Sequence, residues 1–410
     1  MMRGEVTTVS RKRVLTVIGT RPEGIKLAPV VRALQRRATH LESRVAITGQ
    51  HSQMLDQVIE RFGIPRDYDL GIMRDGQTLP DVATACLAGL GGVISEFKPD
   101  IVLVQGDTAT ACFGALAAFL YRTQVGHVEA GLRSGHKWAP YPEEMFRRVS
   151  DVLTDAYFAP TMRARDHLLA ENVNPDNVHV TGNTVVDALL ESAESGAPVA
   201  DALVRELLDG DRPIVLLTAH RRESFGAPMA RIFAAVRTLA DRERVDVLFP
   251  VHPNPNVRDA AHAALGDHPH VHLVEPLDYF DLVQVLHRAV LVLTDSGGIQ
   301  EEAPTFGVPV LVLRDVTERP EGLLTGVVRL VGTDPDVILA EAHDALEATL
   351  LTGRRALNPY GDGHAAERIA DIVCHRLTST PRTTQDWDGV PTVDVARLDA
   401  LRRSLAGARA

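Results

Sequence analysis

The chain has 410 residues, and at about 150 residues per domain this length predicts two or three domains. Hydrophobic residues make up 45% and charged residues 24%, which is typical of a globular protein with a sizeable core and excludes disordered, collagen-like and disulfide-scaffold chains. The net charge of −11 argues against a protein that coats nucleic acid or an anionic membrane, so an anionic ligand must be met by local groups of Arg and Lys.

Short β-branched runs alternate with longer stretches of helical periodicity, which is typical of βαβ units and parallel sheets. In the first half we expect strands at 14–18, 45–48, 101–105, 125–128, 156–158 and 178–180. The alternation restarts near residue 212, with strands expected at 214–217, 247–249, 271–274, 291–293, 310–313 and 328–331. The pattern predicts an α/β fold with two doubly wound, Rossmann-like domains, at 1–184 and 185–375, and a ligand in the cleft between them. Residues 376–410 are expected to form a polar linker and tail with one short helix at 393–406.

Cysteine usage and hydropathy indicate the compartment. Three widely spaced cysteines fit a reducing cytoplasm and offer no thiolate metal site. There is no run of 18 apolar residues, and the N-terminal residues lack the apolar core of a signal peptide. We therefore expect a cytoplasmic protein with no membrane partner.

The turn after the first strand, GTRPEGIK at 19–26, has features of a phosphate site. Gly19 allows a tight turn, and Thr20 with Glu23 matches a capping box at the start of a helix. Arg21 and Lys26 then lie near the positive end of the helix dipole, where phosphate is stabilised. The alternative is a well-capped surface helix with two solvated cations.

Carboxylates follow the third and fourth strands. Asp107 is either a site residue or the N-cap of the next helix, whereas Glu129 beside a buried strand needs a partner. Glu143 opens the helix after a Gly- and Pro-containing loop, and Arg147 lies four residues on, along the same face. Acidic residues are also routine at helix starts. Glu129 and Glu143 would supply two acids from different elements, which suits paired acid–base chemistry.

The second half carries two further strand-end signals. His220 precedes two arginines and is expected to donate a hydrogen bond to a phosphate or sugar; with Glu223 it lacks a third metal ligand at a suitable spacing. The segment TDSGGIQEEAP at 294–304 places Ser296, Gly297 and Gly298 between a strand and a helix, where glycine lets backbone N–H groups approach a pyrophosphate. Glu302 would bind ribose hydroxyls, and Arg319 in the next loop would reach the same diphosphate. A generic glycine-rich turn is the alternative.

Cations, a glycine-rich turn and several carboxylates suit a nucleotide-diphosphate sugar whose diphosphate is the leaving group. The sequence has no P-loop, no supported dinucleotide fingerprint, no metal ligand set and no nucleophile–base triad. The residues alone leave three reactions open: transfer to an acceptor, loss to water, or elimination followed by re-addition.

Ordered motifs from about residue 14 to residue 374 resemble the non-hydrolysing UDP-N-acetylglucosamine 2-epimerases. They are GTRPE (19–23), QHSQML (50–55), GDT (106–108), HVEAGLR (127–133), PEE (142–144), TGNT (181–184), HRRES (220–224), PVHPN (250–254), DSGGIQEEAP (295–304), TERPE (317–321) and NPYGDG (358–363). The resemblance implies the two-domain GT-B-like fold, a homodimer, no metal and no NAD.

The resemblance also implies roles for residues. UDP would leave by anti elimination across C1–C2, giving 2-acetamidoglucal, and would add back with protonation of C2 on the other face. The implied catalytic set is Asp107, Glu129, Glu143, Arg147 and His220. The diphosphate would be held by Arg21, Lys26, Ser296, Gly297, Gly298 and Arg319, the ribose by Glu302, and the uracil near Leu277 and Leu282.

Other reactions stay open beside this one: a hydrolysing 2-epimerase that releases UDP and ManNAc, an epimerase acting on a modified UDP-sugar, and a GT-B glycosyltransferase. Phe146 stands where the family generally has Asn, Leu282 replaces an aromatic residue, and Gln105 stands where His is usual. A candidate allosteric patch is formed by Gln50, His51 and Gln53, as in members activated by UDP-GlcNAc, with Arg74 substituting for an Arg absent at Gly76.

Overall fold

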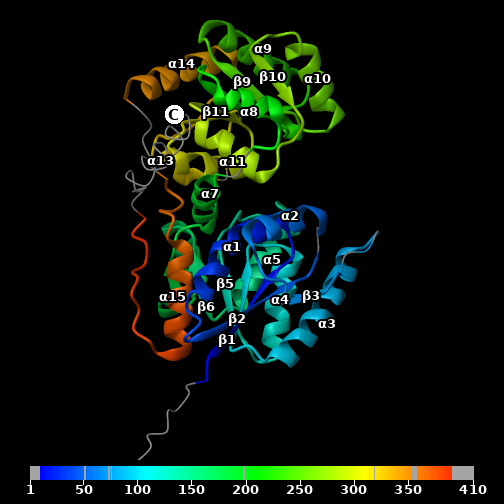
Figure 1. Ribbon diagram of the computed structural model, residues 1–410, viewed down its shortest axis with the longest axis vertical. Helices are drawn as coiled ribbons and strands as arrows, with labels where there is room; N and C mark the ends of the chain where they lie inside the picture. Colours follow the sequence, from blue (N-terminus) through cyan, green and yellow to red (C-terminus); the bar gives the residue numbers. More distant parts are fainter. Residues whose placement is uncertain are drawn as a thin grey trace, which may run out of the picture. The chain divides into compact units, whose positions relative to one another are not determined.

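The computed structural model describes residues 10–49, 52–72, 74, 76–196, 199–317, 319–352 and 358–389, and these form two compact units (Figure 1). The first unit contains the described residues up to Ala188 together with Gly363–Gly389, and the second contains Leu189–Asp362. Among the helices so described, none is both long enough and apolar enough to cross a membrane.

The first unit is built on a parallel sheet of seven strands among its described residues, in the order β3-β2-β1-β4-β5-β6-β7. The strands are β1 (Lys12–Ile18), β2 (Leu41–Ile47), β3 (Tyr68–Asp69), β4 (Ile101–Gln105), β5 (Gln124–Val128), β6 (Ala156–Ala159) and β7 (Val178–Val180). The inner strands are almost wholly buried, as expected for apolar strands with helices on both faces. The six expected strands are present. The seventh, β3, was not expected because two residues carry no periodicity.

Helices cover both faces of this sheet. They are α1 (Arg21–Gln35), α2 (Ser52–Phe62), α3 (Leu79–Phe97), α4 (Ala109–Leu120), α5 (Glu143–Val152), α6 (Met162–Ala170), the 3-10 helix η1 (Pro175–Asn177) and α15 (Ala365–Thr378). Helix α7 (Thr184–Glu194) contains the boundary between the units, after Ala188. The helices α3, α4 and α5 pack side by side, and α1 packs beside α2 and α15. The right-handed crossovers on either side of β1 place these two groups on opposite faces. One core joins β1, β4 and β5 to α3 and α4.

The C-terminal part of the first unit differs from the expected division, which placed residues up to 375 in the second domain and a linker after them. Helix α15 and the residues up to 389 belong to the first unit. Asp371 accepts a hydrogen bond from the backbone N–H of Thr384 (2.7 Å). The backbone N–H of Trp387 donates to the carbonyl of Val180 (2.7 Å), and the residue is 4% exposed. This segment is therefore anchored on the sheet edge; the helix expected at 393–406 lies outside the described residues.

The second unit has a parallel sheet of six strands within its described residues, in the order β10-β9-β8-β11-β12-β13. The strands are β8 (Ile214–Thr218), β9 (Asp246–Pro250), β10 (Val271–Val274), β11 (Leu291–Thr294), β12 (Val310–Val312) and β13 (Val328–Leu330). All six expected strands are present, with ends that differ by one residue at most.

Helices also flank the second sheet (Figure 1). They are α8 (Ala202–Asp209), the 3-10 helix η2 (Arg222–Ser224), α9 (Ala227–Arg242), α10 (Pro255–Leu265), α11 (Tyr279–Arg288), α12 (Gly297–Glu302), the 3-10 helix η3 (Ala303–Phe306), α13 (Pro320–Leu324) and α14 (Pro335–Thr352). Helix α9 packs between α10 and α14, and their apolar side chains form one core with the sheet.

Each sheet reverses its strand order at one point, between β1 and β4 in the first unit and between β8 and β11 in the second. Ligands of such sheets bind beyond the carboxyl ends of the strands at this point. Packing there is tight: a Cβ on Gly19, just after β1, would lie 2.0 Å from the hydroxyl of Thr110, so this position requires glycine. Candidate site residues follow all four strands.

Candidate functional site

Glu129, directly after β5, is the centre of the polar group in the first unit. Its Oε1 accepts bonds from Lys26 Nζ (2.6 Å) and Asn183 Nδ2 (3.0 Å), and its Oε2 from Lys26 Nζ (2.8 Å) and Gln105 Nε2. The side chain is only 8% exposed. All three partners are donors, so the site is arranged for a carboxylate. The residue has φ = 70°, a left-handed conformation that costs a non-glycine residue roughly 1–2 kcal/mol.

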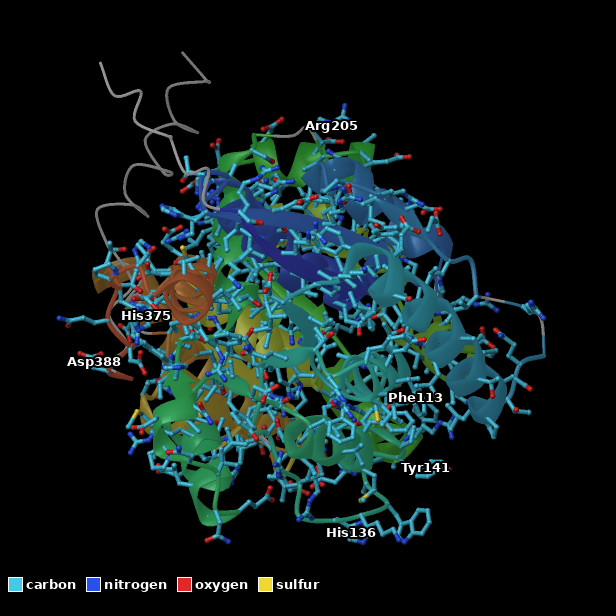
Figure 2. All side chains as sticks on the ribbon, turned by 90° about the horizontal axis from the view of Figure 1, so that it is seen from below. Phe113, His136, Tyr141, Arg205, His375 and Asp388 are labelled. Atoms are coloured by element: carbon cyan, nitrogen blue, oxygen red, sulfur yellow. The ribbon has the colours of Figure 1, made fainter. Side chains whose placement is uncertain are left out.

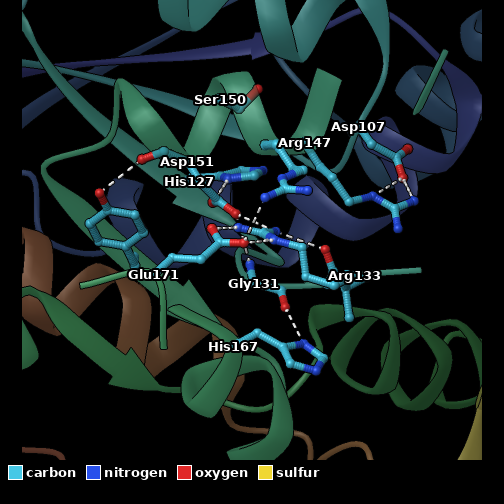
Figure 3. Close-up of polar contacts among 12 residues, drawn as sticks. Asp107, His127, Gly131, Arg133, Arg147, Ser150, Asp151, His167 and Glu171 are labelled. Carbon is cyan, nitrogen blue, oxygen red and sulfur yellow. Dashed lines mark hydrogen bonds and ion pairs between the residues drawn. The ribbon is translucent and has the colours of Figure 1, made fainter. Parts of the chain in front are cut away.

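Asp107 lies two residues after β4 and pairs with Arg147 of α5 (Figure 3). The guanidinium donates from Nε (3.1 Å) and from Nη2 to Asp107 Oδ2. The N-cap of α4 is Thr108, whose hydroxyl accepts from the N–H of Ala111 (3.1 Å). Asp107 is thus not a helix cap, and the structure favours the site interpretation.

The two acids at the start of α5 have different environments. Glu144 is buried and accepts bonds from the N–H of Ser134 (3.0 Å) and from Arg147 Nη1 (3.2 Å), so it joins the preceding loop to α5. Glu143 is half-buried, and within the described chain its carboxylate has no hydrogen bond or ion pair; Arg147 pairs with Glu144 instead. His136 and Tyr141 of the preceding loop are exposed (Figure 2). Glu143 is therefore a carboxyl with no described partner, one helical turn before Arg147 on α5.

A chain of charged groups runs from the buried His127 to Glu171 at the surface (Figure 3). His127 Nδ1 lies 2.7 Å from Asp151 Oδ1, and Asp151 Oδ2 lies 2.7 Å from Arg133 Nη1. Arg133 in turn forms two bonds to Glu171, of 2.9 and 2.7 Å. Burial favours the neutral imidazole, but the neighbouring Asp151 outweighs it and raises the pKa of His127.

The turn after β1 is organised by Glu23. It completes the expected capping box with Thr20, and its Oε2 accepts from the N–H groups of Gly19 (2.8 Å) and Thr20 (2.6 Å). Its Oε1 accepts from the hydroxyl of Thr108. Burial raises the pKa of Glu23 to about 7. Arg21 is the first residue of α1 and half-buried. Because the ammonium of Lys26 bonds to Glu129, its expected contact with a diphosphate stays a prediction.

In the second unit the buried Asp295 joins the ends of β8 and β11. Its Oδ2 accepts from the N–H groups of His220 and Arg221 (both 2.8 Å), and His220 Nδ1 lies 3.0 Å from Oδ1. The ring of His220 stacks on that of His252 at 5.7 Å. Glu223 pairs with Arg314 and not with His220. No group of three or more metal-ligating side chains occurs in the described ranges.

The serine–glycine turn follows directly. The N–H of Ser296 donates to the hydroxyl of Thr294 (2.9 Å), and α12 begins at Gly297. A Cβ on Gly298 would lie 3.4 Å from Glu302 Oε1, so the Glu302 carboxylate lies close to the turn. The structure therefore brings the predicted serine–glycine turn and Glu302 together within the second unit.

The remaining predicted binding residues of the second unit are Arg319, Leu277 and Leu282. Arg319 ion-pairs with Glu301, one position before the expected ribose ligand. Leu277 and Leu282 flank the start of α11 and are both half-buried. The ligand contacts expected of Arg319, Leu277 and Leu282 stay predictions.

The candidate allosteric patch is largely outside the described residues. Gln50 and His51 are not described, and Gln53 lies on α2 with no described side chain. Arg74 is exposed, and its N–H donates to Gln77 Oε1 (2.8 Å). The patch stays a prediction.

Sequence reasoning assigned no site role to Gln105, Asn183, Glu144, His127 or Asp295. Four of them lie near a strand's carboxyl end, at or next to a quoted motif, but amino-acid type alone does not show which side chain bonds to which. The sequence did not single out Glu144 because acidic residues are common in the first turn of helices.

Comparisons with known proteins agree on one family. The family model described as UDP-N-acetylglucosamine 2-epimerase matches residues 32–374. The chain is 47% identical over 370 residues to the UDP-N-acetylglucosamine 2-epimerase of Bacillus subtilis, covering 88% of this chain and 95% of that one. A UDP-GlcNAc 2-epimerase structure from Neisseria meningitidis bound to UDP-GlcNAc has a TM-score of 0.76 and 42% identity, covering 90% of this chain and 100% of the other. A Methanocaldococcus jannaschii UDP-GlcNAc 2-epimerase in complex with UDP-GlcNAc and UDP has a TM-score of 0.69 and 33% identity. The match covers 88% of this chain and 99% of the other.

Proposed function

The chain belongs to the UDP-N-acetylglucosamine 2-epimerase family, and we propose that it interconverts UDP-GlcNAc and UDP-ManNAc by reversible epimerisation at C2. The observation that carries this proposal is the polar group of the first unit, where Glu129 is held by three donors and Asp107 is held by Arg147. Family relatives bound to UDP-GlcNAc support the choice of substrate.

The chemistry follows from the sugar. The C2 hydrogen is not alpha to a carbonyl, so simple deprotonation would give an unstabilised carbanion. Removing the C2 proton while the C1–O bond breaks places the electron pair of that bond on UDP and forms the C1=C2 bond of 2-acetamidoglucal. UDP then re-adds at C1 as a proton is delivered to the other face of C2. Acid–base groups are therefore needed on both faces of the ring.

We assign this acid–base work to Asp107, Glu129 and Glu143. Arg147 orients Asp107, and Glu144 orients Arg147 through the bonds described above. His220, whose backbone N–H donates to Asp295, would donate from its ring to the departing diphosphate or the sugar. Within the first unit, the bonds to Asp107 and Glu129 already hold these two carboxylates, and such positioning lowers a reaction barrier.

We assign the UDP moiety chiefly to the second unit. Ser296, Gly297 and Gly298 would offer backbone N–H groups to the diphosphate, and Arg319 would add positive charge, together with Arg21 and Lys26. Glu302, close to Gly298, would accept bonds from the ribose hydroxyls. Leu277 and Leu282 would contact the uracil.

The principal competing function is a hydrolysing 2-epimerase. Incubating the purified chain with UDP-GlcNAc and recording proton and phosphorus NMR spectra separates the two. Epimerisation gives a second UDP-linked anomeric signal and a stable mixture of both sugars. Release of UDP and free ManNAc would overturn the proposal, and turnover only when an acceptor is added would indicate a glycosyltransferase.

We also propose a cytoplasmic homodimer. The three cysteines are free thiols and buried, which fits a reducing compartment. Phe119 (57% exposed) and Leu120 (63%) at the end of α4 and Val152 (82%) at the end of α5 leave apolar surface uncovered on neighbouring helices. Sedimentation velocity should give a mass near twice the 44.6 kDa of the chain, and a monomer at micromolar concentration would contradict this.

A further inference from the structure

His127 faces a hydrogen-bond acceptor with each of its two ring nitrogens. Nδ1 lies 2.7 Å from Asp151 Oδ1, and Nε2 lies 2.8 Å from the carbonyl oxygen of Gly106. The ring is 0% exposed, so water cannot substitute for either partner. A neutral imidazole has one N–H and one lone pair, and either tautomer would set that lone pair against an acceptor. Only the imidazolium satisfies both contacts.

The proton could instead reside on Asp151, but the other contacts of this residue oppose it. Asp151 Oδ2 lies 2.7 Å from Arg133 Nη1 and accepts from the N–H of Gly131 (3.2 Å). These donors stabilise a carboxylate. Glu129 adds a further negative charge near the ring. The two carboxylates near His127, Asp151 of α5 and Glu129 of the loop after β5, therefore favour the cation.

The two bonds of His127 connect it to the segments that carry Asp107 and Arg147. One bond goes to Gly106, the residue before Asp107, and the other to Asp151, on the same helix as Arg147. The peptide before Asp107 is fixed on both sides, because Gly106 donates its N–H to the carbonyl of Val128 (3.0 Å) and accepts from His127. Asp151 lies one helical turn after Arg147 on α5. A single buried ring thus connects the backbone of Asp107 to the helix that carries its partner.

We propose that His127 is a positioning residue, held as an imidazolium, whose two N–H groups fix Asp107 and Arg147 in register for the reaction. The role in catalysis rests on the proposed function; the protonation state does not. The residue needs no contact with the substrate, so its removal should act on the rate of the chemical step and leave the affinity for UDP unchanged.

Neutron diffraction from crystals of the full chain at pD 8 tests the protonation state without any substitution. We expect deuterium on both ring nitrogens of His127. A bare Nδ1 or Nε2, or a deuteron on Asp151, would overturn the proposal. Because no substrate is needed, this result is independent of whether the chain epimerises UDP-GlcNAc.

Variant kinetics test the positioning role. His127→Gln keeps hydrogen-bonding capacity but cannot donate to both acceptors; we expect kcat to fall about 100-fold, the effect of a misplacement near 1 Å, with the Kd for UDP changed less than twofold. The matched control is His167→Gln, because His167 uses one ring nitrogen, to the carbonyl of Gly131 (2.9 Å), and should keep kcat within threefold.

Equal losses in both variants, or unchanged kcat in His127→Gln, would contradict the role. If melting and UDP binding show that His127→Gln does not fold, the neutron result alone tests the proposal, through the protonation state of His127. An inactive wild-type chain would refute the proposed function and leave the protonation state to be judged separately.

Discussion

Replacing Glu129 by Gln should damage the site more than the loss of one charge suggests. Each carboxylate oxygen accepts from two donors, so either orientation of the amide sets its NH2 group against Lys26 and a second donor. The substitution also leaves the ammonium of Lys26 without its negative partner at 2.6 Å. Both effects act in the folded state, so stability and activity should fall together.

The magnitude follows from the geometry. At 2.6 Å and an effective dielectric constant of about 20, the attraction is about 6 kcal/mol before desolvation, which cancels most of it. Exposure of 19% for Lys26 and 8% for Glu129 places the pair between surface and interior. We expect Glu129→Gln to lower the free energy of unfolding by about 1–3 kcal/mol and kcat by roughly 10²–10⁴-fold.

A double-mutant cycle with Lys26→Gln isolates the interaction. Urea unfolding of the wild type, both single variants and the double variant should give a coupling energy of about 1–2 kcal/mol, with the double variant more stable than the sum predicts. Additive losses would show that the Lys26–Glu129 contact contributes nothing, and near-normal kcat in Glu129→Gln would refute its role as an acid–base group.

Three other changes test separate parts of the site. Glu143→Gln should lower kcat by roughly 10²–10⁴-fold while unfolding shifts by less than about 0.5 kcal/mol, because its carboxylate has no described partner; a large loss of stability would contradict this. Arg319→Ala should weaken UDP binding in calorimetry by about 10- to 100-fold, the contribution of a charged hydrogen bond, whereas unchanged affinity would remove Arg319 from the diphosphate site. The folded-state pKa of Glu23 is raised to about 7 from 4.5, so its contribution to stability is fully present below pH 4.5 and is lost as pH rises through 7, by up to about 3 kcal/mol. Glu23→Gln can bond to the same partners without titrating, so its unfolding free energy should lack this fall; parallel pH curves for the two proteins would refute the assignment.

The strand pattern was predictable because a buried parallel strand needs a continuous apolar run. Residues 101–105 and 214–217 show this directly, and both are buried along almost their whole length. The two-residue β3 lacks such a run and pairs only with Ala46 and Ile47 at the end of β2. The return of α15 to the first unit depends on contacts such as those of Ala365 and Ala366 with Asp187, 178 and 179 residues away, which local pattern does not show.

The candidate site was predictable at the level of residue type and not of pairing. Strand-end position singled out Asp107 and Glu129, and the helix start after the Gly- and Pro-containing loop singled out Glu143; the family resemblance implied the same three residues. It did not show that Lys26 bonds to Glu129 or that Glu144 holds Arg147. Lys26 and Glu129 come from different elements, and Glu143 and Glu144 are adjacent acids of the same type. Which side chains pair therefore depends on where the backbone places each of them.

Hydrogen exchange at C2 of the sugar bears most directly on the proposed chemistry. When the wild-type chain converts UDP-GlcNAc in deuterium oxide, UDP-ManNAc should carry deuterium at C2, and the recovered UDP-GlcNAc should become labelled as the mixture equilibrates. UDP-ManNAc that retains the original C2 hydrogen would contradict proton removal by the acidic residues of the first unit.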